Sequence, residues 1–304
     1  MRDPAVLPSV DVMLDISSLS RSFGENVAVD DVTFRVVPGR VTGFVGANGA
    51  GKTTTMRMIL GVLAPTSGQV LWNGQPITTA QRRRFGYMPE ERGLYPRMKL
   101  LEQLVFLARL HGTSRDEAAR RAEELLGHFD LADRADDVLD TLSLGNQQRV
   151  QIAASLIHRP DALVLDEPFS GLDPVAVDAM AALLAKEAGD KPLLFSSHQL
   201  DLVERLCDDL VILSHGKVVA AGPVDDLRGQ GPDRYRVVLD GADAAWLRDV
   251  RGIQVRDIDG PTALVDLDGQ TASALLAEII AREPVREFAR VRQPLSAIFR
   301  EVIR

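Results

Sequence analysis

The stretch GANGAGKT, residues 46–53, decides the fold class of this chain. It matches G-x-x-x-x-G-K-[ST], a pattern in which glycines let backbone N–H groups close around phosphate oxygens. Lys52 supplies a positive charge to the outer phosphates, and the Thr53 hydroxyl is placed to hold Mg²⁺. The apolar run VTGFV comes before the stretch, and a helical apolar pattern follows it. Because strand, glycine-rich loop and helix follow in that order, the sequence predicts a parallel α/β domain that binds a nucleotide.

The totals of the chain restrict its size class and its partners. It has 304 residues, of which 45% are hydrophobic, and this suffices for one large or two modest domains. The formal net charge of −8 argues against a nucleic-acid partner, which needs a basic face. The basic triplet at residues 82–84 is more typical of a solvated loop or helix face.

The cysteine count and the apolar runs indicate where the protein works. The single cysteine, Cys207, allows no intrachain disulfide, and its apolar helical context favours a buried core thiol in a reducing compartment. The first ten residues lack the apolar centre of a signal peptide, and no run is long enough to cross a bilayer. We therefore expect a cytosolic protein, or one held at a membrane by a partner.

The rest of the chain predicts a helical subdomain and a second small domain. Residues 90–158 are mostly helical, with a well-buried helix over LLEQLVFLARLHG and a capping box formed by Ser114 and Glu117. The runs ALVLDEP and PLLFSSH read as buried parallel strands, and a hairpin turns at His215–Gly216. A linker, GQGPD, ends this first domain at residue 229. Residues 230–304 then read as β-α-β-β-α-β plus a last helix from Pro294, a ferredoxin-like α+β domain.

Two acids, Asp166 and Glu167, end the strand ALVLDEP. In an open parallel sheet, ligands lie at the carboxyl ends of the strands, so both carboxylates should lie beside the phosphate loop. Successive strand residues point in opposite directions, which gives the two acids different roles. Asp166 suits the magnesium shell, through a bridging water, and Glu167 suits the polarisation of an attacking water. A pair of acids that caps a helix is the alternative interpretation.

A second stretch, TLSLGNQQRVQ at residues 141–151, also has the composition of a phosphate-binding loop. It carries a hydroxyl, a glycine and several amides directly before an apolar helical pattern. Free N–H groups and the macrodipole make a helix N-terminus favourable for anions. The residues alone do not distinguish such a site from an ordinary N-capped helix, and they leave open why one chain has two such devices.

In order and spacing, the phosphate loop, LSLGNQQR, LVLDEP, SGLD and SSH resemble the motifs of an ABC transporter ATP-binding subunit. The resemblance covers about residues 12–225 and implies a P-loop NTPase core with a helical subdomain, using ATP and Mg²⁺. It also implies that two copies pack head to tail around two ATPs. Ser143, Gly145 and Asn146 would then contact the nucleotide of the partner, so each phosphate-binding stretch is half of a site. The usual L-S-G-G-Q is changed at Leu144 and Asn146, while the serine and the second glycine remain.

The same resemblance implies roles for residues elsewhere in the chain. Glu167 would be the catalytic base, assisted by His198, which matches the switch histidine that contacts the γ-phosphate, and Lys52 would act on the outer phosphates. Asp173 belongs to the loop that connects the two sites, and Phe23 stacks on adenine, where tyrosine is commoner. A structural histidine and a core phenylalanine are the alternatives. The nucleotide-binding positions of the phosphate loop are Gly46, Asn48, Gly49, Ala50, Gly51, Lys52, Thr53 and Thr54.

The run GYMPEERGLYP differs from the family pattern at Glu90, where glutamine is usual. The family residue ligates Mg²⁺ together with Thr53 and Asp166, and a carboxylate is also a hard oxygen ligand. Without the metal a carboxylate would repel the triphosphate, so we expect a stronger metal dependence here. The run PEERGLYP also resembles the branch of subunits that serve ABC-2-type exporters, whose members often carry a C-terminal domain.

The resemblance implies an ATP-hydrolysing motor of an exporter. Its partners would be a multi-span permease and a second ATP-binding subunit, either another copy or a related chain, with no nucleic acid. It would lie at the cytoplasmic face of the plasma membrane, bound through the permease. A soluble ABC-type ATPase acting on ribosomes or DNA is the alternative, although such proteins carry two cassettes or a long coiled coil. A module that binds ATP without hydrolysis is less compatible with Glu167 and His198. The transported substrate and the role of the C-terminal domain are not encoded in these motifs.

Overall fold

The computed structural model describes residues 14–91, 93–228, 233–241, 243–291 and Leu295. The chain divides into two compact units, Met1–Val224 and Asp225–Arg304. The structure therefore divides the chain after Val224, a few residues before the division that the sequence predicts after residue 229, at the start of the linker GQGPD. Residues 229–232 of that linker lie outside the described residues.

A six-stranded sheet in the order β10-β9-β3-β8-β7-β6 forms the centre of the first unit. All its neighbouring strands are parallel except the edge pair β9 and β10. The hairpin between those two strands turns at His215 and Gly216, both with positive φ, as expected. The strands are β3 (Val41–Val45), β6 (Phe85–Met88), β7 (Ala162–Leu165), β8 (Leu193–Ser197), β9 (Asp209–Ser214) and β10 (Lys217–Pro223). The parallel α/β prediction is confirmed, and the carboxyl ends of β3, β7 and β8 lie at one edge.

A second, antiparallel sheet in the order β2-β1-β4-β5 packs over the same core. Its strands are β1 (Leu14–Phe23), β2 (Asn26–Val36), β4 (Ser67–Trp72) and β5 (Gln75–Pro76). Aromatic pairs connect the two sheets: the rings of Phe34 and Phe44 stack with centroids 5.2 Å apart, and those of Trp72 and Phe85 are 5.0 Å apart. Helix α1 (Lys52–Ile59) contributes Met56 and Ile59 to this core.

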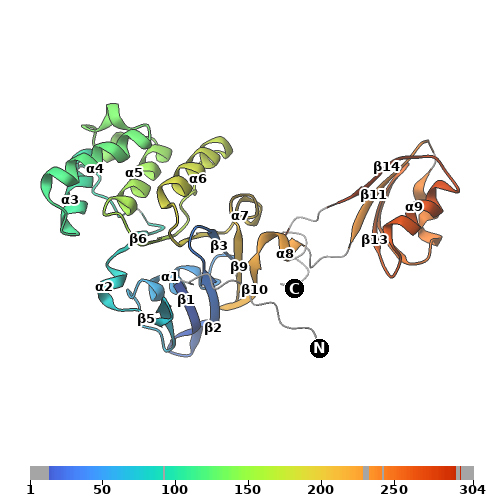
Figure 1. Cartoon of the computed structure of the whole chain (residues 1–304), viewed down its shortest axis with the longest axis horizontal. Coiled ribbons are helices and arrows are strands. Elements are labelled where there is room, and N and C mark those ends of the chain that lie inside the picture. Colours follow the sequence, from blue (N-terminus) through green and yellow to red (C-terminus); the bar gives the residue numbers. More distant parts are fainter. Residues whose placement is uncertain (1–13, 92, 229–232, 242, 292–294, 296–304) are drawn as a thin grey trace. The chain divides into compact units, whose positions relative to one another are not determined.

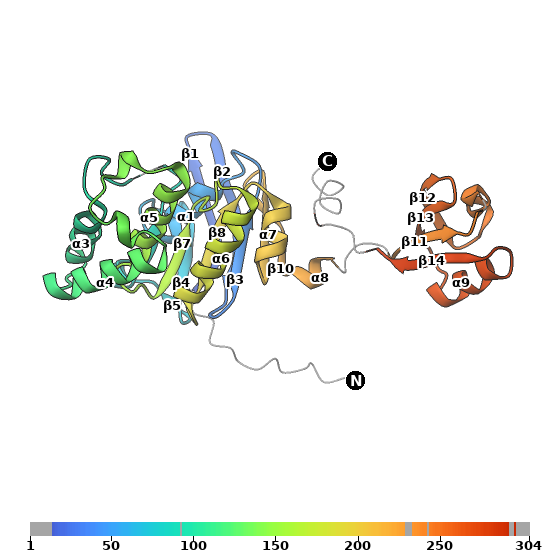
Figure 2. The same cartoon turned by 90° about the horizontal axis from the view of Figure 1, so that it is seen from above.

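Three helices between β6 and β7 form the expected helical subdomain, and they gather at one side of the first unit in Figure 1. They are α3 (Leu100–Leu110), α4 (Arg115–His128) and α5 (Leu144–Leu156), with short 3₁₀ turns η1 (Ala132–Arg134) and η2 (Leu139–Thr141) between α4 and α5. The other helices of this unit are α2 (Thr79–Arg82), α6 (Pro174–Ala188) and α7 (Leu200–Leu206), and α8 (Val224–Arg228) follows at the division. Figure 2 shows α6 and α7 along the six-stranded sheet.

Two expectations about the helical subdomain were wrong in part. Helix α3 is not buried around its circumference, because Phe106 and Leu110 are 38% and 67% exposed. Its buried face consists of Leu100, Leu104 and Ala108 with Gln103. Ser114 caps α4 by accepting a hydrogen bond from the N–H of Glu117, as expected. The Glu117 carboxylate pairs instead with Arg120 and Arg159, so the reciprocal half of the capping box is replaced by ion pairs.

The second unit has the ferredoxin-like topology that the sequence predicts. Its strands β11 (Arg234–Leu239), β12 (Ile253–Asp259), β13 (Thr262–Leu267) and β14 (Val285–Arg290) pair antiparallel in the order β12-β13-β11-β14. The first crossover is a 3₁₀ helix, η3 (Ala244–Asp249), and the second is α9 (Ala272–Ile280). Leu247 and Leu275 pack with Val237 and Val265 into a separate core. The last helix expected from Pro294 lies outside the described residues apart from Leu295.

Candidate ATP-binding and hydrolysis site

The loop from Gly46 to Gly51 connects β3 to α1 and has a conformation that requires glycine. Gly49 and Gly51 have φ of +79° and +101°. A Cβ on Gly51 would approach the carbonyl oxygen of Ala28 to 2.7 Å. Helix α1 has no side-chain cap and no acidic residue in its first turn. Its first N–H groups are therefore not used by a cap or opposed by a carboxylate, which suits the binding of an anion.

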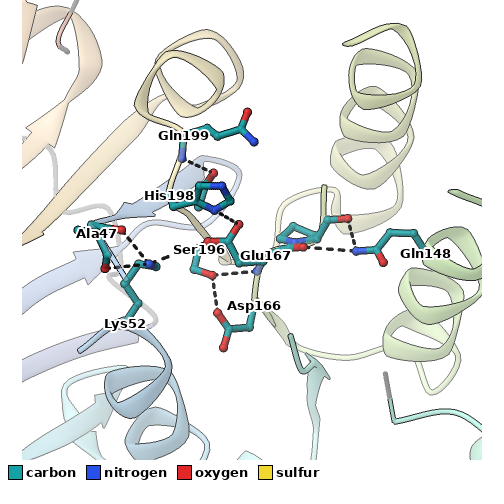
Figure 3. Close-up of polar contacts among 11 residues, drawn as sticks. Ala47, Lys52, Gln148, Asp166, Glu167, Ser196, His198 and Gln199 are labelled. Carbon is teal, nitrogen blue, oxygen red and sulfur yellow. Dashed lines mark hydrogen bonds and ion pairs between the residues drawn. The ribbon is translucent and has the colours of Figure 1, made fainter. Parts of the chain in front are cut away.

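Lys52 lies inside this loop and is only 7% exposed. Its Nζ donates to the carbonyl oxygens of Gly46 at 2.8 Å and Ala47 at 3.3 Å, and lies 4.0 Å from Oε1 of Glu167 (Figure 3). A cavity of about 330 Å³ opens here, and nine of its ten lining residues are candidates from the sequence or lie in the loop. The lining residues are Ala28, Asn48, Gly49, Gly51, Lys52, Thr53, Thr54, Glu90, Asp166 and Glu167.

Asp166 follows the end of β7 and is 1% exposed. Its Oδ1 accepts a hydrogen bond of 2.5 Å from the hydroxyl of Ser196, whereas its Oδ2 has no partner among the described residues. The hydroxyl of Thr53 and the carboxylate of Glu90 line the same cavity. Within the described part of the chain, no group of three or more His, Cys, Asp or Glu side chains could hold a metal alone. An orphaned carboxylate oxygen, a hydroxyl and a second carboxylate fit Mg²⁺, which keeps water and phosphate ligands.

Glu167 has the backbone conformation of a residue under strain, with φ of +52°. Its N–H donates to Oγ of Ser196 at 2.9 Å, and its carboxylate Oε2 lies 3.0 Å from Nδ1 of His198. The side chain is largely buried. Burial raises the pKa of the Glu167 carboxyl, and the neighbouring His198 and Lys52 oppose part of that rise. A carboxylate with a raised pKa at the edge of a phosphate-binding cavity is a suitable general base.

The N-terminus of α5 lies apart from this cavity. Ser143 caps the helix, with its Oγ accepting from the N–H of Asn146 at 3.4 Å, and Leu144 packs over Gly171. None of Ser143, Gly145 and Asn146 is among the described residues that line the cavity. Further along α5, the Gln148 amide donates to the carbonyl oxygens of Glu167 at 3.3 Å and Pro168 at 2.6 Å.

Two further candidates also lie outside the cavity lining. Asp173 caps α6, and its Oδ1 accepts from the N–H groups of Val175 and Ala176. Phe23 is 49% exposed at the end of β1, with the Arg21 guanidinium 4.7 Å from its ring centroid. The alternative of a core phenylalanine is therefore wrong, because about half of this residue is open to solvent. The other face of the ring is free of this cation and could stack on a base.

Two residues of the site were missed from the sequence. Ser196 is fully buried beside Asp166, and only the register of β7 on β8 brings them together. The pairing of Leu165 with Phe195 places the next residues, Asp166 and Ser196, side by side. Ala28 lines the cavity from β2, with no chemical signal in its side chain.

Comparison with known proteins gives the family. The sequence profile described as "ABC transporter" matches residues 29–170. An ABC transporter ATP-binding protein of Bacillus subtilis strain 168, YhaQ, is 36% identical over 96% of this chain and 98% of its own length. The chain belongs to the ABC transporter ATP-binding proteins.

Other members of this family support the same assignment. The Nod factor export ATP-binding protein I of Paraburkholderia xenovorans strain LB400 is 32% identical, over 92% of this chain and 90% of its own. A solved ATP-binding subunit of an ABC transporter is 36% identical, with a TM-score of 0.65 over 72% of this chain and 92% of its own. Members of the family bind ATP and hydrolyse it in transport, and they work with membrane permeases. In the described residues of this ABC protein, no helix combines the length and apolarity needed to cross a bilayer.

Proposed function

We propose that this ABC protein is the ATP-hydrolysing motor of an exporter, at the cytoplasmic face of the plasma membrane. The observation that carries the proposal is the separation of two phosphate-binding devices within one chain. Lys52 and Glu167 line one cavity, and His198 contacts Glu167, while the Ser143 end of α5 lies outside the lining of that cavity. A second ATP-binding subunit that packs head to tail would supply the missing half of each site. The direction of transport is supported by the Nod factor export relative.

The residues of the cavity have distinct proposed roles in hydrolysis. Backbone N–H groups of Asn48 to Thr53 and the charge of Lys52 bind the β- and γ-phosphates. Thr53, Asp166 and Glu90 would hold Mg²⁺, which neutralises charge on the phosphates when it is bound. Glu167 accepts a proton from the attacking water.

His198 and the partner subunit complete this proposed site. The contact between Glu167 and Nδ1 of His198 would orient the carboxylate, and the histidine side chain, which is 46% exposed, would contact the γ-phosphate. Ser143, Gly145 and Asn146 of the second subunit would then close over that phosphate with the N-terminus of α5. Asp173, which caps α6, lies on the loop that follows the catalytic glutamate and would contact the partner.

A second cavity, of about 380 Å³, is the proposed docking site of the permease. The amide of Gln151 is 5% exposed, and neither its nitrogen nor its oxygen has a partner among the described residues. Nδ1 of His158 is also without a partner there, since Nε2 faces the carbonyl oxygen of Phe85 at 3.2 Å. Buried polar groups of this kind are normally satisfied, so a ligand that hydrogen-bonds to them is expected. The lining comprises Leu60, Val62, Arg82, Arg83, Phe85, Tyr87, Met88, Pro89, Gly93, Leu94, Leu107, His111, Gln151, Ala154, Ser155 and His158.

The charge of this cavity indicates the chemistry of the docking segment. The described lining contains Arg82 and Arg83 and no carboxylate, in a chain whose formal net charge is −8. Val62, which lines the cavity, is 70% exposed, and Leu110, the residue before the lining residue His111, is 67% exposed. An amphipathic permease segment that presents apolar side chains and a carboxylate complements this surface.

Affinity purification from detergent-solubilised membranes, with mass spectrometry, tests the proposed function. A stoichiometric multi-span protein is the expected result. Recovery only with ribosomes or DNA-repair factors would instead support the soluble mechanical ATPase. Reversal of charge by Arg83→Glu should reduce recovery of the permease at least fivefold at unchanged ATPase activity. Arg109→Glu is the matched control, since Arg109 is exposed on α3 outside the cavity lining. Equal recovery with both variants would exclude this cavity as the docking site.

A further inference from the structure

Ser196 connects the two acidic residues of the ATPase site through one hydroxyl group. Its Oγ donates to Oδ1 of Asp166 at 2.5 Å and accepts from the backbone N–H of Glu167 at 2.9 Å. Figure 3 shows the serine between the two residues. A hydroxyl has one proton to donate, and here that proton is committed to the carboxylate while a lone pair receives the N–H. Ser196 is fully buried, so water does not substitute for either bond.

The bond to Asp166 determines which carboxylate oxygen is left for other ligands. Asp166 lines the nucleotide cavity, and Oδ2 is its oxygen without a partner in the described part of the chain. The hydroxyl thus holds Oδ1 and leaves Oδ2 available. Hydrogen bonds to the non-ligating oxygen of a carboxylate are the usual means by which a protein orients a metal ligand.

The bond to Glu167 acts on a strained backbone. A non-glycine residue at φ of +52° persists only where its surroundings hold it. Two such contacts are present: the Ser196 oxygen receives the N–H, and the Gln148 amide donates to the carbonyl oxygen. Loss of the serine hydroxyl would leave the buried N–H of Glu167 without an acceptor and the backbone with one restraint fewer.

We propose that Ser196 is a positioning residue of the ATPase reaction. Its hydroxyl aims the free oxygen of Asp166 at the magnesium of the nucleotide and keeps the backbone of Glu167 in the conformation that presents its carboxylate. Ser196 touches neither nucleotide nor metal and acts through these two residues. The inference rests on the proposed role of Asp166 toward the metal.

Binding of Mn²⁺ to the full-length protein tests this proposal without relying on turnover. The free ion gives an EPR signal that is lost on binding, so Mn²⁺ is titrated into protein held in excess over ADP. In Ser196→Ala, the dissociation constant of Mn²⁺ should rise about tenfold, because loss of a group that orients a ligand costs about 10- to 100-fold in metal affinity. At saturating ATP, kcat should fall about tenfold while KM for ATP changes less than twofold.

Two variants separate the hydroxyl from its position in the strand. Ser196→Thr keeps a hydroxyl and should restore Mn²⁺ affinity to within about twofold of the wild type. Ser197→Ala is the matched control, because Ser197 is the next residue of β8, is also buried, and its Oγ accepts from the N–H of Gln199. It should leave the Mn²⁺ affinity unchanged. If Ser196→Ala does not fold, Ser196→Cys replaces it, since the thiol keeps the shape and is a weak donor.

A further variant distinguishes failure of this inference from failure of the proposed site. Asp166→Asn should weaken Mn²⁺ at least as much as Ser196→Ala. If Asp166→Asn weakens Mn²⁺ and Ser196→Ala does not, Ser196 has no positioning role. If the Ser196→Thr variant binds Mn²⁺ as poorly as the alanine variant, the hydroxyl is not the cause. If Asp166→Asn leaves Mn²⁺ affinity unchanged, the proposed metal role of Asp166 fails, and with it this inference.

Discussion

Replacement of Glu167 by glutamine should lower the rate of ATP hydrolysis without changing the stability of the fold. The amide has the shape of the carboxylate but does not accept a proton from water. General-base catalysis contributes about 10²- to 10⁴-fold to a rate, so kcat of Glu167→Gln should fall by that factor. This corresponds to about 3–5 kcal/mol of barrier.

The structure predicts that this variant stays folded. Burial penalises the charged form of Glu167, which raises the pKa of its carboxyl, and a neutral amide avoids that penalty. The variant loses the 4.0 Å ion pair with Lys52 and keeps a hydrogen-bonding group opposite Nδ1 of His198. These effects oppose each other, so Tm should change by less than about 3 °C, as expected for about 1 kcal/mol in a domain of this size.

Phosphate release and thermal unfolding of purified protein check the two expectations, and size-exclusion chromatography with ATP and Mg²⁺ should show trapped dimers. Glu187→Gln is a control in which the stability, and not the ATPase rate, should change. The Glu187 side chain is 9% exposed and pairs with Arg121 at 3.0 Å and with His128 at 2.6 Å. Its replacement should lower Tm by several degrees and retain most of the ATPase rate. Retention of more than about a tenth of wild-type activity by Glu167→Gln would remove this residue from the role of base.

Three other perturbations test separate parts of the molecule. Glu90→Gln should lower the Mg²⁺ concentration that ATP binding requires, because it removes a carboxylate that repels the triphosphate when no metal is bound; an unchanged Mg²⁺ titration of nucleotide binding would contradict this. Burial and the stacked His111 lower the pKa of His158 in the folded protein to about 4, from the ordinary value of 6.5. As the pH falls from about 6.5 to about 4, the unfolded chain binds a proton at His158 and the folded protein does not, so the free energy of unfolding decreases. Thermal melts over this range should show a smaller loss of stability in His158→Gln than in the wild type, and parallel curves would refute the assignment. Gly51→Ala places a Cβ 2.7 Å from the carbonyl oxygen of Ala28, on a residue with φ of +101°. Denaturant unfolding should therefore show that the free energy of unfolding decreases by about 1–3 kcal/mol. A decrease below about 0.5 kcal/mol would show that the loop adapts to the side chain.

The parts of the site that follow from chain order could be predicted from the sequence. Gly46 to Thr53 comes after one strand, and Asp166 with Glu167 comes directly after another. Parallel strands bring their carboxyl ends to one edge, so the two motifs meet without any knowledge of side-chain packing. The ferredoxin-like unit follows for the same reason, because its order of strands and helices is compatible with few topologies.

The parts that depend on register and on exposed faces could not be predicted. The contact of Ser196 with Asp166 needs the pairing of Leu165 with Phe195, which hydrophobic periodicity does not give. The same limitation explains the error about α3, where the pattern shows apolar residues on several faces but not which face has a neighbour. Phe106 and Leu110 are exposed for this reason. The residues at the N-terminus of α5 do not line the cavity, so only the resemblance indicates a role for them.

The hydrogen bonds of Gln148 have a genetic consequence. This residue belongs to α5, whose N-terminus would contact the partner's nucleotide, and its amide donates to the backbone carbonyl oxygens of Pro168 and of Glu167, the proposed base of its own chain. In a dimer with composite sites, a defective chain therefore contributes its phosphate loop to one site and its α5 N-terminus to the other, so both sites contain residues of the defective chain. A mutant allele expressed beside the wild type should be dominant. With equal expression and random pairing, only about a quarter of the dimers contain two wild-type chains.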